Sequence, residues 1–293
     1  MTTELASTPA GTTEDHAALS SPETIIAPSA FGGDIRRMWR LTLTLATTEF
    51  RLRYLGSFLG YLWSLLRPLL FFGVLYVVFT QVFKVGSGAH YGVYLLSNII
   101  LWSFFLEVTG ASIGCLVARE GLLRKMRFPR LAIPLSVCLT SSFTLLMNLV
   151  VVLIFALANG VEPRWTWLEV PVIVALWCAL ALGVGMILSI LYVRMRDVQP
   201  IWDVISQILF YGSPLVYTLH RYSPGAWKYV LINPIAALTT QMAHVFVDPS
   251  YPSAGHAMGG TVRVLAPLAI GVVVVAFGLR LFIKRAPLIA ENL

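Results

Sequence analysis

The chain has 293 residues, of which 57% are hydrophobic and only 12% are charged. An ordinary soluble domain is about 45–50% apolar and about 25% charged, so this composition excludes a water-soluble fold and requires apolar surface that faces lipid. The formal net charge of +7 indicates Lys and Arg gathered in the cytoplasmic loops of a membrane protein, rather than a nucleic-acid partner.

The first 33 residues differ in composition from the rest of the chain. They are rich in Thr, Ser, Ala and Pro, and they have neither the basic start nor the apolar centre of a secretory signal. We expect a disordered cytoplasmic tail over residues 1–33.

Residues 34–57 are predicted to form an amphipathic helix. At about 100° per residue, one face is basic and polar, with Arg36, Arg40, Thr44, Thr47 and Arg51. The opposite face is apolar, with Met38, Leu41, Leu45 and Leu52. On that side Glu49 and Arg53 lie four residues apart and could pair. The pattern favours a helix that lies in the plane of the membrane interface; the alternative is a helix that packs on the rest of the protein.

The segments that follow include six that are long and apolar enough for a transmembrane helix, which needs about 20 residues. In chain order they are 58–83, 93–117, 131–158, 168–192, 201–219 and 264–283. The fifth has the weakest pattern, because Asp203, Gln207, Ser213 and Pro214 interrupt it. The fold expected for 58–293 is therefore an all-α integral membrane domain with six transmembrane helices.

The distribution of basic residues predicts the orientation. With the N-terminus inside, most Arg and Lys fall in cytoplasmic stretches, and the outside stretches hold only Lys84, Arg164, Arg221, Lys228 and Arg263. Such an asymmetry is typical of cytoplasmic loops. It predicts a multi-pass protein of the bacterial inner membrane with both termini in the cytoplasm.

A moderately apolar run at 227–247 lies in the long outside stretch between the last two predicted helices. Asn233-Pro234, Gln241 and His244 interrupt it, and a full crossing would place Lys284 and Arg285 outside, against the charge rule. We expect a re-entrant external hairpin, which is tolerated only where it is buried in protein or lines an aqueous cavity.

No catalytic, cofactor or metal motif is present in the sequence. Gly183-Val184-Gly185 is not followed by the Gly-Lys-Ser/Thr of a Walker A loop, and the His and Cys residues have no metal-ligand spacing. We therefore predict a transport subunit with no catalytic residue, no metal and no ATPase site. The energy for transport must come from a partner or an ion gradient.

Polar and aromatic residues within the predicted helices suggest two further roles. Glu107 is predicted to make a structural hydrogen bond or to line a wet cavity; the alternative is a proton relay. Several aromatic residues offer flat faces to a sugar chain, although such residues also serve as ordinary packing and interface anchors. They are Tyr61, Trp63, Phe71, Phe72, Tyr76, Phe210 and Tyr211.

Three stretches together carry a family resemblance. They are the run Arg53 to Trp63 (RYLGSFLGYLW), the run Leu122 to Arg130 (LLRKMRFPR) followed by Pro134-Leu135-Ser136, and Arg196-Asp197-Val198 followed by Trp202, Ser213-Pro214 and Asn233-Pro234. From about residue 34 to the C-terminus, the chain resembles the ABC-2 type permeases that export polysaccharides: O-antigen, teichoic acid and mycobacterial galactan exporters.

The resemblance implies a homodimer of permeases that works with two separate ATPase subunits, which bind the ATP and Mg. It implies that residues 119–130 form a coupling helix on the ATPase, through Arg119, Glu120, Leu122, Arg124, Lys125, Arg127, Phe128, Pro129 and Arg130. The first and fifth helices would line the channel and form its lateral gate. Family members often carry Asn near position 119, so Arg119-Glu120 is a departure.

The substrate implied is a glycan on a polyprenyl diphosphate, with cell-wall galactan or O-antigen as examples. Its diphosphate enters from the cytoplasmic leaflet, so Arg51, Arg53 and Arg67 are candidates to receive it. The alternatives are an ABC-2 permease for a drug or small lipid and a membrane-embedded glycosyltransferase. The latter needs a carboxylate cluster or metal site that the sequence does not display.

Overall fold

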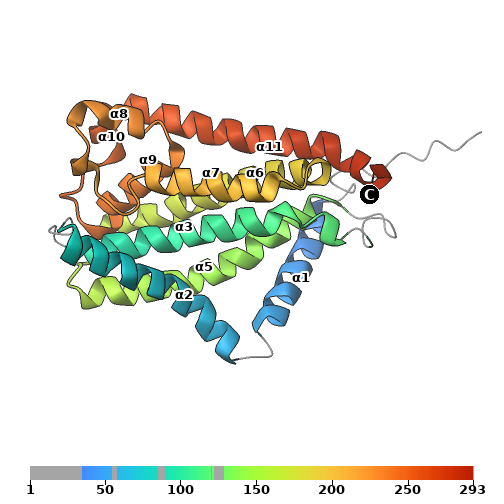
Figure 1. Ribbon diagram of the computed structural model, residues 1–293, viewed down its shortest axis with the longest axis horizontal. Helices are drawn as coiled ribbons and strands as arrows, with labels where there is room; N and C mark the ends of the chain where they lie inside the picture. The colour runs from blue at the N-terminus through green and yellow to red at the C-terminus, as the bar shows by residue number, and fades with distance from the viewer. Residues whose placement is uncertain (1–34, 55–57, 85–89, 120, 122–128, 293) are drawn as a thin grey trace, which may run out of the picture.

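The computed structural model describes residues 35–54, 58–84, 90–119, 121 and 129–292, and the regular structure in these ranges is helical, with no strand among them. Most of the long helices lie side by side in one elongated bundle, and the first helix runs at a steep angle to them (Figure 1). In chain order the helices are α1 (Ile35–Tyr54), α2 (Phe58–Val77), α3 (Tyr91–Ile113), α5 (Ala132–Ala158), α6 (Val170–Arg194), α7 (Val198–Gly212), α8 (Trp227–Val230), α9 (Pro234–Met242), α10 (Ala254–Ala257) and α11 (Leu265–Asn292). The predicted tail over 1–33 lies outside the described residues.

Five helices of the described chain are long and apolar enough to cross a membrane. They cover Leu62–Val82, Tyr91–Ile113, Ala132–Ala158, Trp165–Arg194 and Thr261–Arg285. Each corresponds to a predicted span, and an all-helical membrane protein is confirmed. The count of six spans is not confirmed, because the helix formed in the segment predicted at 201–219 is too short to be counted as a membrane span.

That segment forms α7, a helix of 15 residues. At 1.5 Å per residue it is about 22 Å long, shorter than a hydrocarbon core of about 30 Å. The helix ends at Gly212 because Pro214 disfavours a helical conformation at Ser213, which is extended with φ −110° and ψ 150°. The sequence pattern therefore located the helix correctly but overestimated its length.

The non-helical backbone after α7 is buried, and side chains of α3 satisfy its carbonyl groups. The Tyr91 hydroxyl donates to the carbonyl oxygen of Val216 at 2.7 Å, and the Asn98 amide donates to that of Leu215 at 3.3 Å. The Tyr94 hydroxyl donates to the Tyr217 carbonyl oxygen at 3.1 Å and also to that of Pro214. Irregular backbone within a membrane protein requires such internal partners.

Helix α3 lies at the centre of the bundle and α2 and α11 at its edges. In the most apolar stretch of α3, 78% of the residues are buried. In the corresponding stretches of the spans that contain α2 and α11, only 6% and 11% of the residues are buried. Helix α3 packs on α2, α5, α6 and α7, whereas α11 packs mainly on α6. The apolar side chains of α2 and α11 are thus left for lipid or a second chain.

Two glycines allow α6 and α11 to cross closely. A Cβ on Gly183 would lie 2.9 Å from the Val275 Cα, and a Cβ on Gly278 would collide with the Gly183 carbonyl group. Small residues at such crossings let two helix backbones approach each other, which is a common way to pack helices in a membrane.

Helix α1 packs against α5 along a ridge on one of its faces. Met38, Thr42 and Ala46 are buried on this ridge, and the Thr140 hydroxyl of α5 donates to the Ala46 carbonyl oxygen at 3.3 Å. The predicted apolar face is partly wrong: Leu52 is 80% exposed, while Thr42 is fully buried. Packing favoured Thr42 and Ala46 because their small side chains let the two helices meet. Whether α1 also lies in a membrane interface stays a prediction.

The bundle has two different ends. We call the end that holds the Arg119 and Arg130 region the basal end, and the end formed by α8, α9 and α10 the distal end (Figure 1). The run at 227–247 forms α8, α9 and a π turn at Ala243–Val247, and Leu231, Met242 and Val247 in it are completely buried. Helix α9 and the π turn are largely buried, whereas none of the described residues of α8 is buried, so the expected re-entrant hairpin stays a prediction.

Candidate functional site

A cavity of about 420 Å³ opens at the basal end, where α1, α3 and α5 meet. We call it the basal cavity. Most of the residues that line it have polar or small side chains. They are Glu49, Arg53, Gly110, Ala111, Gly114, Cys115, Ala118, Arg119, Val137, Thr140 and Gln199. Its volume lies within the range of about 300–1,000 Å³ typical of small-ligand sites.

The Arg119 side chain forms an ion pair with Glu49 of α1. Arg119 ends a short 3-10 turn, Val117–Arg119, that follows α3, and its guanidinium also donates to the Ser136 hydroxyl of α5 at 3.4 Å. The Arg119 side chain is only 18% exposed, and burial lowers its pKa from the ordinary value. A guanidinium nevertheless stays charged near neutral pH, so this pair joins α1 to the region just before residues 120–130.

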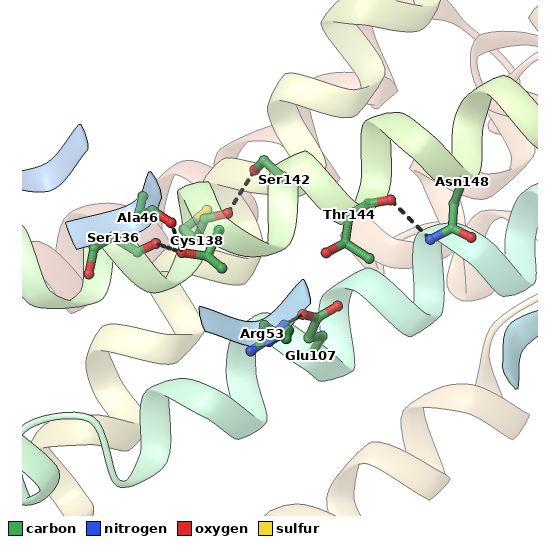
Figure 2. A network of polar contacts seen from close by, with 9 residues as sticks. Ala46, Arg53, Glu107, Ser136, Cys138, Ser142, Thr144 and Asn148 are labelled. Carbon is green, nitrogen blue, oxygen red and sulfur yellow. Dashed lines mark hydrogen bonds and ion pairs between the residues drawn. The ribbon is translucent and has the colours of Figure 1, made fainter. Parts of the chain in front are cut away.

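A second ion pair joins Arg53, near the end of α1, to Glu107 of α3 (Figure 2). Both side chains are partly accessible, at 44% and 29% exposure. Glu49 and Arg53 were predicted to pair with each other; in the structure each has a charged partner on another element. Glu107 therefore has a charged partner within the protein, and the choice between a structural role and a proton relay stays a prediction.

Polar side chains on the neighbouring part of α5 satisfy their hydrogen bonds within the protein. The hydroxyl of Ser142 donates to the Cys138 carbonyl oxygen at 2.8 Å, and the Asn148 amide donates to that of Thr144 at 3.0 Å (Figure 2). These bonds to the preceding turn let α5 carry polar residues through an apolar environment.

Small residues form the α3 side of the basal cavity. Gly110 lies in α3, Gly114 and Ala118 lie in the turn and the 3-10 segment that follow it, and all three line the cavity. A Cβ added at Gly110 or Gly114 would meet nothing within 4 Å, which shows that open space lies beside them. Sequence reasoning missed these residues, although their spacing of four was a signal that could have found them.

Three of the predicted coupling residues lie in described parts of the chain. Arg119 lines the basal cavity, and Pro129 and Arg130 are buried where α5 begins. The Pro129 carbonyl oxygen accepts from the Ala132 amide at 2.9 Å, which starts the helix. Glu120, Leu122, Arg124, Lys125, Arg127 and Phe128 lie outside the described residues.

The three Arg residues predicted to receive the diphosphate occupy different positions. Arg53 lines the basal cavity, whereas Arg51 and Arg67 are exposed and do not line it. The structure therefore groups Arg53 with Arg119, a coupling candidate, and not with Arg67. Sequence reasoning missed this grouping because 119 and 53 are far apart in the chain.

The predicted channel aromatics lie on α2 and α7, and one ring contact joins the two helices. The rings of Phe71 and Phe210 are 6.0 Å apart between centroids, and Phe210 also contacts Tyr211 and Trp102. The remaining ones on α2 differ in exposure: Trp63, Phe71 and Tyr76 are exposed, and Phe72 is half-buried between Tyr76 and Phe155. The backbone of Tyr61 lies in α2, and its side chain is outside the described part of the structure. A role in a channel stays a prediction.

Two of the sequence motifs meet at the distal end. The Asn233 amide donates to the Ser213 hydroxyl at 2.9 Å, and the Asn233 side-chain oxygen accepts from the Ile235 amide, so that Asn233 caps α9. Ser213-Pro214 and Asn233-Pro234 thus fix the end of α7 to the start of α9.

Among the described residues, no group of three or more His, Cys, Asp or Glu side chains could hold a metal ion. The basal cavity contains charged groups that are paired with each other or with neighbouring helices. With five helices in the described part of the chain that are long and apolar enough to cross a membrane, the protein has the features of a helical membrane protein.

Comparison with known proteins gives the family. The ABC-2 type transporter family matches residues 40–247, and the chain belongs to this family. It is 28% identical over 255 residues to the O-antigen export system permease protein RfbA of Myxococcus xanthus, covering 86% of this chain and 95% of that protein. It is 26% identical to the RfbA of Klebsiella pneumoniae, covering 72% and 82%, and 24% identical to the polysialic acid transport protein KpsM of Escherichia coli, covering 71% and 81%.

Proposed function

We propose that this protein is the membrane-spanning permease subunit of an exporter that moves a polysaccharide on a polyprenyl diphosphate out of the cytoplasm. Two copies work with two copies of a separate ATPase subunit. The observation that carries the proposal is similarity, over most of their length, to proteins named as O-antigen export permeases and as a polysialic acid transport protein.

The arrangement of charge supports the proposed orientation. Arg194 at the end of α6 and Arg280 and Lys284 in the second half of α11 lie toward the basal end, whereas Arg164, Arg221 and Lys228 belong to the distal end. An excess of basic residues on one side marks the cytoplasmic side of a membrane protein. The basal end then faces the cytoplasm and the ATPase.

The basal cavity supports a route for motion from the ATPase to α1. Residues 119–130 dock on the ATPase, and Arg119 at the start of this segment is ion-paired with Glu49. Movement of the segment then pulls on α1, which holds α3 through Arg53 and Glu107. Rigid-body shifts of packed helices of this kind are a common form of switching.

The same cavity is the proposed entry for the diphosphate headgroup. Arg53 and Arg119 both line it, and guanidinium groups suit phosphate oxygens because their donors form a planar fork. The headgroup takes the place of Glu49 or Glu107 as the partner of one Arg. Filling the cavity at Gly110 with Leu should therefore block export, while the complex with the ATPase still assembles.

The first test is purification of the tagged chain from its native membranes in a mild detergent. We expect a P-loop ATPase in equal amount, lost when Arg124→Glu and Lys125→Glu are combined. Depletion of the chain should remove polysaccharide from the cell surface and accumulate it inside. Recovery of the chain without an ATPase, with surface polysaccharide unchanged on depletion, would overturn the proposal.

A further inference from the structure

A second hollow of about 440 Å³ opens at the distal end, opposite the basal cavity. We call it the distal pocket. Three of the five histidines of the chain line it, namely His220, His244 and His256, together with Trp227, Tyr251 and Ser253. These residues come from the segment between α7 and α11, which includes α8 and α10 (Figure 1).

Hydrogen bonds hold the walls of the distal pocket in place. His244 Nδ1 lies 2.7 Å from the Tyr251 carbonyl oxygen, and since that oxygen only accepts, Nδ1 carries the proton. In the neutral ring, Nε2 is then an acceptor. The Ser253 hydroxyl oxygen accepts from the His256 amide at 3.2 Å, which leaves its own proton to donate to a ligand.

Trp227 forms an aromatic wall. Its Nε1 donates to the Tyr222 carbonyl oxygen at 3.1 Å, and the His220 ring contacts it edge-on with centroids 5.6 Å apart. Trp227 also packs on a buried cluster that contains Leu219, Leu231 and Met258. The wall is therefore part of a packed scaffold and exists before any ligand arrives.

The lining selects among ligand classes. It contains no Asp, Glu, Lys or Arg, so it offers no charged partner to a phosphate or an amine. The three imidazoles do not form a metal site, because no such group occurs among the described residues. What remains is a set of neutral donors and acceptors beside aromatic faces.

A pyranose ring has complementary chemistry, with C–H groups on its faces and hydroxyls around its rim that both donate and accept. Sites for such ligands combine aromatic surface with a few placed polar groups. We propose that the distal pocket binds a sugar residue of the exported glycan on the outer side of the membrane. This inference rests on the proposed function and adds a saccharide contact at the distal end, far from the cavity proposed for the diphosphate headgroup.

The test uses the full-length chain in lipid nanodiscs. The probes are oligosaccharides released by mild acid from the surface polysaccharide of the native strain, and binding is measured by saturation-transfer NMR. The variant combines His220→Ala with His256→Ala, because both residues are exposed. The control combines Arg221→Ala with Lys228→Ala, which are exposed neighbours that do not line the pocket.

We expect binding about tenfold weaker in the His220→Ala and His256→Ala variant, because hydrogen bonds to the sugar are lost, and unchanged binding in the control. If the unmodified chain does not bind the oligosaccharides, or if the control loses as much affinity as the histidine variant, the proposal that the distal pocket binds a sugar is overturned. Surface polysaccharide is measured in the same strains. Normal export without saccharide binding rejects the pocket alone. Pocket-dependent binding in a protein whose depletion leaves surface polysaccharide intact rejects the proposed function alone.

Discussion

Arg119 and Glu49 form an ion pair that connects the segment after α3 to helix α1. The sequence placed these two residues in different predicted helices, a coupling helix and an interface helix. The structure places them together in one cavity with Arg53, whose partner Glu107 lies on α3. Charged side chains therefore connect α1 both to α3 and to the turn that follows α3.

The first prediction concerns this ion pair. Arg119→Glu places two carboxylates against each other and should lower both the melting temperature and export. Glu49→Arg in the same chain should restore most of both, because the charges are exchanged and not removed. Partly exposed pairs contribute on the order of 1 kcal/mol, so we expect a coupling energy of that size in a double-mutant cycle measured by unfolding in detergent. Arg51→Glu, on the exposed side of the same helix, is the control and should change little.

The second prediction separates a structural role of Glu107 from a proton relay. Glu107→Gln removes its ion pair with Arg53 and should lower the melting temperature slightly, as should Arg53→Gln. The two changes together should cost little more than either alone, because they break the same contact. A proton relay would give another pattern: export abolished by Glu107→Gln at unchanged stability, with Arg53→Gln harmless.

The third prediction contrasts two glycines within helices. A Cβ at Gly110 meets open space, so Gly110→Ala should stabilise α3 by about 0.5–1 kcal/mol through reduced backbone entropy of the unfolded chain. A Cβ at Gly183 would lie 2.9 Å from the Val275 Cα, so Gly183→Ala should force α6 and α11 apart and cost about 1–3 kcal/mol. Thermal unfolding of the two variants measures both. Equal effects would show that the α6–α11 crossing is not close.

The fourth prediction concerns pH and the distal end. The Ser250 amide donates to the Asp248 carboxylate at 2.8 Å, and this bond, together with the nearby Arg164 and His90, lowers the pKa of Asp248. A lowered pKa in the folded state means that the stabilisation is fully present above the ordinary pKa of about 3.9 and is lost as pH falls through the folded value.

Asp248→Asn should therefore lower the melting temperature at pH 7, and the difference from the unmodified chain should shrink below about pH 4. Melting curves of both proteins from pH 3 to 7 measure this. A difference that stays constant over that range would show that the charge of Asp248 does not stabilise the fold.

The sequence determined the helical membrane fold and most of the span positions. Long apolar runs at 131–158 and 168–192 can satisfy their backbone in lipid only as helices, so their composition nearly fixes their structure. The amphipathic pattern over 34–57 likewise located α1, which covers Ile35–Tyr54. These features depend on residues near one another in the chain, which a sequence displays directly.

Only the tertiary structure decided the length of α7, the buried face of α1 and the partners of the charged residues. Arg53 and Glu107 are 54 residues apart, and no periodicity relates them. The carbonyls after Gly212 are tolerated because Tyr91, Tyr94 and Asn98 reach them from another helix. Contacts of this kind form only when helices pack. A buried polar group is costly without a hydrogen bond, and its partner comes from whichever element lies beside it in space.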